Sequence, residues 1–269
     1  MDIWDSLAQS VLLLCVVASG LLWMRILSGP GRAVGWLDEQ ASSEHVPVLE
    51  LLIVTCLLWP TVPRLVASMV PIAAGQATGP LRLTIGNLAL WGVLIMFDRG
   101  MADPSLDSAQ RLRLLPCRRD LRIGVFGFLA SVGPVIAVMM LTRTLRTEES
   151  QHPYLRLVSD SPAAEVIGAV ALAAIVAAPL TEELVFRVIL QRSLERFHPL
   201  VALLSISLLF AAIHADSLAR LPDVAGLFLL GLILGFVYQR TRSYPAVVIT
   251  HLLFNALNLG LICLNLMSQ

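Results

Sequence analysis

The chain has 269 residues, of which 57% are hydrophobic and only 14% charged, and its mean hydropathy is +0.79. Soluble proteins carry charge on about a quarter of their residues, so this composition predicts a chain embedded in lipid. Nineteen basic residues, all arginine, balance nineteen acidic ones. That balance excludes the basic surplus with which nucleic-acid-binding proteins attract their partner, and the expected partner is the lipid bilayer.

Apolar runs divide the chain into candidate membrane helices. Because a spanning helix needs about 20 mostly apolar residues, we predict an all-α, polytopic transmembrane helix bundle of about eight spans. The sixth and seventh runs fit the pattern least well. The spans are expected near residues 6–27, 46–63, 81–97, 121–141, 163–183, 200–215, 224–239 and 244–264.

The stretch 98–120 is the one long charged connection, and its arginines alternate with leucines. It is typical of an interfacial segment held to anionic headgroups. With eight spans, 13 arginines fall on the side of this segment and 6 on the other side. The positive-inside rule then places the segment in the cytoplasm and both termini outside. The absence of lysine suggests GC-rich bacterial codon usage, so we expect the bacterial inner (cytoplasmic) membrane, multi-pass.

The strongest functional signal is a charged cluster inside an apolar helix, Glu182-Glu183-x-x-x-Arg187. Buried charge in a bilayer is costly and marks a functional site by default. Glu183 and Arg187 are four residues apart and can pair, while Glu182 points about 100° away toward another helix. Pro179 removes a backbone hydrogen bond just upstream and is expected to break the helix locally.

Two further motifs carry polar side chains in apolar surroundings, Phe210-x-x-x-His214 and His251-x-x-x-Asn255. The spacing of four places His251 and Asn255 on one helix face, within reach of one ligand. Taken singly, either histidine is more often a hydrogen-bonded core residue. Glu183 and His214 are equally distant along the chain from a turn placed at Phe197-His198-Pro199, so antiparallel helices would bring them level.

In order, these three motifs resemble those of the CPBP family of intramembrane proteases, also called the CAAX prenyl endopeptidase or ABI family. The resemblance covers roughly residues 160–260. It divides the chain into residues 1–120, N-terminal helices and the charged segment with no assigned function, and residues 121–269, a protease core with its motifs within 181–255.

The resemblance implies a membrane endopeptidase, a hydrolase that cleaves a peptide or protein presented at or in the membrane. Glu182 would activate a water, His214, His251 and Asn255 would complete the site, and Glu183 and Arg187 would support it. Glu182, His214 and His251 also satisfy the ligand count of a catalytic zinc site, so we expect a Zn²⁺ cofactor and a metalloprotease. A metal-free mechanism with glutamate and histidine stays open, and Asn255 is better suited to an oxyanion than to zinc.

Two other classes of function stay open on the sequence. A non-catalytic membrane immunity or scaffold protein could keep the polar cluster for packing. A proton-coupled or ion-coupled transporter could use the same residues as a relay, although transporters often carry matching polar sites in two inverted halves. Gly231 and Gly235 form a small-residue face that predicts close packing within the bundle. The oligomeric state is not indicated.

Overall fold

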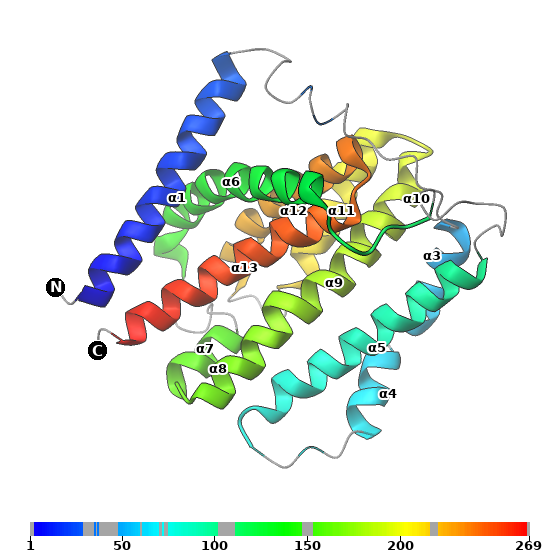
Figure 1. Ribbon diagram of the computed structural model, residues 1–269, viewed down its shortest axis with the longest axis horizontal. Coiled ribbons are helices and arrows are strands. Elements are labelled where there is room, and N and C mark those ends of the chain that lie inside the picture. Colours follow the sequence, from blue (N-terminus) through cyan, green and yellow to red (C-terminus); the bar gives the residue numbers. More distant parts are fainter. Residues whose placement is uncertain are drawn as a thin grey trace.

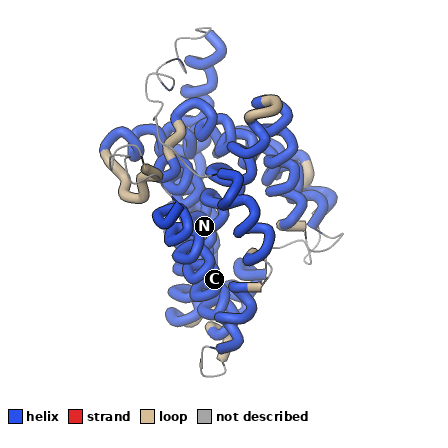
Figure 2. Tube along the Cα trace, turned by 90° about the vertical axis from the view of Figure 1, so that its right-hand side faces the viewer, coloured by secondary structure: helices blue, strands red, loops and turns tan. Residues whose placement is uncertain are grey.

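The computed structural model describes residues 3–28, 35, 37, 48–59, 61–69, 72, 75–101, 111–146, 153–215 and 220–267. All regular elements in these ranges are helices, which confirms the predicted all-α class (Figures 1 and 2). The first half contains α1 (Ile3–Ser28), α3 (Val48–Leu58), α4 (Val62–Met69), α5 (Thr78–Met101) and α6 (Arg118–Leu141). The second half contains η2 (Arg143–Leu145), α7 (Pro153–Asp160), α8 (Ala164–Ala171), η4 (Leu172–Ala177), α9 (Ala178–Glu183), η5 (Leu184–Gln191), α10 (Arg192–Glu195), α11 (Pro199–Ile213), α12 (Leu221–Thr241) and α13 (Tyr244–Met267).

Six helices in the described part of the chain are long and apolar enough to cross a membrane. They are α1, α5, α6, the continuous helix Ala164–Glu195, α12 and α13. Two shorter apolar helices, Leu49–Leu58 and Pro199–Ile213, correspond to the second and sixth predicted spans. About eight spans is therefore consistent with the fold, and the chain is an integral, multi-pass membrane protein.

The structure corrects the second predicted span. The residues described within 46–63 form two helices rather than one, because α3 ends at Leu58 and α4 begins at Val62. Proline cannot donate to the helical ladder, and Pro63 is the second residue of α4, where no intrahelical donor is needed. The seventh span, in contrast, is the full helix α12 of 21 residues.

The predicted interfacial segment 98–120 begins and ends within helices. Helix α5 continues to Met101, and α6 begins at Arg118. Asp120 caps α6, since its carboxylate accepts the backbone N–H of Cys117 at 2.8 Å and a hydrogen bond from Arg113 at 2.8 Å. Residues 102–110 of the segment lie outside the described residues.

The helix Ala164–Glu195 runs through the middle of the bundle (Figure 1) and alternates between α and π geometry. The π segments η4 and η5 lie on either side of the short α9. Segments of π-helix are rare and concentrate at functional sites. Glu182 and Glu183 are the last two residues of α9, and Pro179 lies near its start. The local break that we expect at Pro179 is therefore close to the acidic pair.

The small residues of α6 and α12 allow close packing of neighbouring helices. A Cβ on Gly231 would lie 3.2 Å from the backbone of Ser207 in α11, which confirms packing within the bundle. Gly124 and Gly127 of α6 meet Ile249 and Thr250 of α13 in the same manner. The start of α1 and the end of α13 lie near each other in both views (Figures 1 and 2).

Candidate active site

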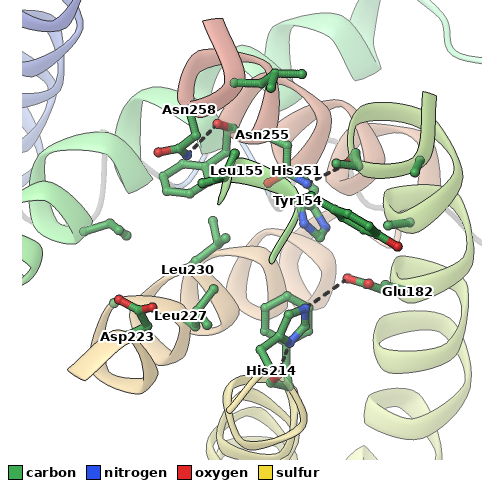
Figure 3. Close-up of a pocket in the computed structure, with 18 of the residues that line it drawn as sticks. Tyr154, Leu155, Glu182, His214, Asp223, Leu227, Leu230, His251, Asn255 and Asn258 are labelled. Atoms are coloured by element: carbon green, nitrogen blue, oxygen red, sulfur yellow. Dashed lines mark hydrogen bonds and ion pairs between the residues drawn. The ribbon is translucent and has the colours of Figure 1, made fainter. Parts of the chain in front are cut away.

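A cavity of about 690 Å³ opens between the central helix, α11, α12 and α13. Glu182, His214, His251 and Asn255 all line it, so residues from the three motifs meet at one place. Figure 3 shows Glu182 and His214 pointing toward each other, with His251 and Asn255 on the adjoining wall. Glu183 and Arg187 lie behind the cavity with fully buried side chains.

Glu182 and His214 face each other across the cavity. Glu182 Oε2 lies 3.8 Å from His214 Nε2, and the two side chains are 18% and 20% exposed. This separation is too long for a direct hydrogen bond but lets one water molecule reach both atoms. His214 stands just after the last residue of α11 rather than inside the helix, where sequence analysis had placed it.

The tautomer of neutral His214 follows from its backbone contact. Its Nδ1 lies 2.6 Å from the carbonyl oxygen of Phe210. A carbonyl only accepts, so Nδ1 carries the proton and donates it. The other ring nitrogen, Nε2, then offers a lone pair toward Glu182 and the cavity.

Glu183 joins the central helix to α13. One carboxylate oxygen accepts a hydrogen bond from Arg187 Nε at 3.2 Å, and the other accepts one from His251 Nδ1 at 2.7 Å. The pairing of Glu183 with Arg187 was predicted from spacing, whereas the contact with His251 was not. Because Nδ1 of His251 donates to Glu183, Nε2 is the nitrogen left to accept in the neutral ring.

Asn255 supplies a hydrogen bond that Pro179 cannot. In η4 the N–H of Ala178 bonds the carbonyl of Ala173, and the next carbonyl in this register, that of Ala174, would face the absent N–H of Pro179. Asn255 Nδ2 donates to the Ala174 oxygen at 2.8 Å instead. One N–H and the amide oxygen of Asn255 stay available at the cavity wall.

Phe210 packs among the polar residues. Its ring lies 4.7 Å from the His214 ring and 5.8 Å from the His251 ring, centroid to centroid. The guanidinium carbon of Arg187 lies 5.3 Å from the centroid of Phe210, within the range of a cation–π contact. Phe210 therefore fixes the two imidazoles by packing while its carbonyl sets the tautomer of one.

Residues from distant elements support the site, and no motif in the sequence marked them. The Tyr244 hydroxyl donates to the carbonyl of Leu180 at 2.7 Å and accepts from Trp91 Nε1 at 2.8 Å, which ties α5, α9 and α13 together. Asn258 lies three residues after Asn255 and lines the cavity, and helical spacing could have identified it.

The far end of the cavity is also polar. Arg146 and Asp223 pair at 2.7 Å, and Tyr154 and Leu155 of α7 form part of the wall. Burial raises the pKa of the Tyr154 phenol, so this side chain stays neutral at ordinary pH. No pattern in the sequence marked α7 as part of the site.

The three predicted zinc ligands do not gather into a metal site in this arrangement. Within the described ranges, no group of three His, Cys, Asp or Glu side chains could hold a metal ion. His251 already donates from one ring nitrogen to Glu183. The presence of zinc stays a prediction.

Comparison with known proteins agrees with the motif resemblance. Residues 165–257 match the family model described as Rce1-like, Type II CAAX prenyl endopeptidase Rce1-like. The matched stretch contains all three motifs and runs from α8 into α13. No curated protein and no solved structure matches the chain. The motif resemblance is thus confirmed over residues 165–257, where the chain is similar to the Rce1-like CAAX prenyl endopeptidases.

Proposed function

We propose that the protein is an intramembrane endopeptidase in which Glu182 activates a water molecule for attack on a peptide bond. The observation that carries this proposal is the facing pair of Glu182 and His214 at 3.8 Å on the wall of a cavity largely lined by apolar residues. A carboxylate and an imidazole lone pair aimed at one point are the groups that general base catalysis needs.

The carboxylate of Glu182 takes one proton from the water molecule as the oxygen of that water bonds to the carbonyl carbon of the substrate. His214 Nε2 accepts the second hydrogen of the same water and thereby fixes its direction. The carbonyl π electrons move onto oxygen, and the free N–H of Asn255 donates to that oxyanion. Glu182 then returns its proton to the leaving nitrogen as the C–N bond breaks, which leaves a carboxylic acid and an amine.

The substrate is expected to be a peptide segment presented at or in the membrane. Leu155, Leu227 and Leu230 form an apolar wall beside the hydrolytic residues (Figure 3). Such a wall favours apolar side chains next to the cleaved bond. The CAAX-type substrate comes from the family alone, and prenylation of the substrate is not required by the cavity. We place this activity in the bacterial inner membrane.

Replacement of Glu182 by Gln tests the catalytic assignment. Glu182→Gln keeps the size of the side chain and removes the base, so cleavage of membrane-anchored peptides in liposomes should fall at least about 100-fold. The matched control is Glu165→Gln, an exposed glutamate on the same continuous helix, which should cleave as the parent does. Fragments are measured by mass spectrometry. Equal cleavage by Glu182→Gln and the parent would remove Glu182 from catalysis.

Metal analysis tests the zinc prediction. Zinc bound through Glu182, His214 and His251 should give about one metal per purified chain and should be lost in His251→Ala. A metal-free mechanism predicts equal, negligible metal in both proteins and full cleavage by the parent after treatment with a chelator. Elemental analysis of the two preparations, with cleavage assayed before and after chelation, separates these outcomes.

A further inference from the structure

A row of polar side chains continues from the site along the central helix. Glu183, Arg187, Gln191 and Glu195 follow each other at intervals of four residues. Four residues overshoot a full α-helical turn, and the wider turns of η5 offset that drift. The exposed fraction of the side chain is 0% for Glu183 and Arg187 and 7% for Glu195, and Gln191 is fully buried.

Gln191 is the link between the two halves of this row. Its Oε1 accepts from Arg187 Nη1 at 3.3 Å, and its Nε2 donates to the carbonyl of Gly235 at 3.0 Å and to Glu195 Oε1 at 3.0 Å. A guanidinium can only donate and a carbonyl can only accept. The amide therefore has one permitted orientation, because a flip would set its NH₂ against the guanidinium donor and its oxygen against two acceptor oxygens.

Arg187 depends on Gln191 for its position. The guanidinium is fully buried, and among the described residues its Nη2 has no hydrogen-bond partner. Glu183 accepts a hydrogen bond from Nε and Gln191 accepts one from Nη1. These two contacts set the plane of the Arg187 guanidinium. Loss of the Gln191 contact would leave a second buried donor unpaired and free the fork to turn.

The position of Arg187 affects that of His251 through the carboxylate of Glu183, which contacts both residues. Glu183 binds Arg187 with Oε2 and His251 Nδ1 with Oε1, so a turn of the carboxylate toward a displaced guanidinium changes the hydrogen bond to the imidazole. We propose that Gln191, which does not line the cavity, is a positioning residue that fixes the His251 imidazole through Arg187 and Glu183. The expected effect on cleavage rests on the proposed function. The effect on the position of the His251 imidazole can be tested without it.

The surroundings of Gln191 fit this role. Gly235 of α12 leaves room for both the amide and Leu203 of α11, since a Cβ there would lie 2.5 Å from Leu203, 2.7 Å from Gln191 Oε1 and 3.4 Å from Arg187 Nη1. At the outer end Glu195 pairs with Arg242, which follows α12 and adopts a left-handed backbone with φ of 52°. The row is therefore tied to Gly235 of α12 and to Arg242, the residue that follows this helix.

The experiment follows His251 directly by NMR. In protein labelled with ¹⁵N-histidine, a proton shared between His251 Nδ1 and Glu183 should give a low-field resonance that is absent in His251→Gln. Gln191→Met retains the length of the side chain and removes both hydrogen-bonding groups. It should shift or broaden this resonance and lower kcat about tenfold or more with KM unchanged.

The matched control is Gln239→Met. Gln239 lies on α12 outside the row and also donates its amide to a backbone carbonyl, that of Pro199 at 2.7 Å. This variant should keep the resonance and the kcat of the parent. If Gln191→Met does not fold, Gly235→Ala perturbs the same amide from the other side, with Gly231→Ala as the control for crowding between α11 and α12.

Each outcome decides one claim. A resonance that moves in Gln191→Met and Gly235→Ala but not in the controls supports the positioning role, even if the parent cleaves nothing and the proposed function fails. An unchanged resonance overturns the positioning role whatever happens to kcat. A moved resonance with unchanged kcat in a cleaving parent overturns its relevance to catalysis.

Discussion

At the scale of single residues, two adjacent glutamates have different surroundings. Glu182 is 18% exposed and faces the cavity, whereas Glu183 is fully buried between Arg187 and His251. One carboxylate is placed to meet a substrate water, and the other compensates a buried guanidinium. The same substitution at the two positions should therefore have different consequences.

Glu183→Gln should destabilise the fold, while Glu182→Gln should not. Removal of one partner of a buried ion pair leaves an uncompensated charge and costs about 3–5 kcal/mol. Thermal unfolding in detergent, followed by circular dichroism, should show a lowered midpoint for Glu183→Gln alone. Equal midpoints for the two variants would contradict a structural role for the buried pair.

Only part of the residue-scale arrangement could be predicted from the sequence. The pair of Glu183 and Arg187 is local and follows from helical spacing. The contact of Glu183 with His251 joins residues 68 positions apart and depends on how α13 packs against the central helix. No motif in the sequence marks Gln191, because its contact with Gly235 depends on how α12 packs against the central helix.

At the scale of elements, the π segment η4 of the central helix adjoins Pro179. The missing N–H leaves the Ala174 carbonyl without its partner in the π ladder, and Asn255 of α13 supplies the donor. Pro179 predicts a break in the helix but not the π geometry of η4. The register of the backbone hydrogen bonds there depends on the Asn255 amide, which comes from another helix. The division of α3 from α4 likewise adjoins a proline, Pro63, and the hydropathy of residues 46–63 concealed it.

Pro179→Ala should lower cleavage about tenfold or more. The new N–H can bond within the helix, which favours regular α geometry and releases Asn255 from Ala174. Cleavage assays in liposomes measure the effect. Pro134→Ala, which changes a proline inside α6, is the matched control and should cleave as the parent does. Parent-level cleavage by Pro179→Ala would show that the irregular turn is not needed for the site.

At the scale of the whole molecule, helices from both halves of the chain enclose one cavity. The fold class and the count of about eight spans followed from apolar runs, since lipid permits few alternatives to helices. The cavity could not be derived in this way, because its wall includes Tyr154 of α7 and Leu83 of α5, which lie far from the three motifs in sequence. The division of the chain into residues 1–120, with no assigned function, and a protease core of residues 121–269 stays a prediction.

The origin of the oxygen in the product tests the central claim most directly. Liposomes with the parent protein and membrane-anchored peptides are incubated in H₂¹⁸O, and the fragments are weighed by mass spectrometry. Water attack assisted by Glu182 predicts one ¹⁸O in each newly formed carboxylate, with fragment yield reduced about 100-fold in Glu182→Gln. Failure of the parent to form labelled fragments, or equal labelling by Glu182→Gln, would contradict the account.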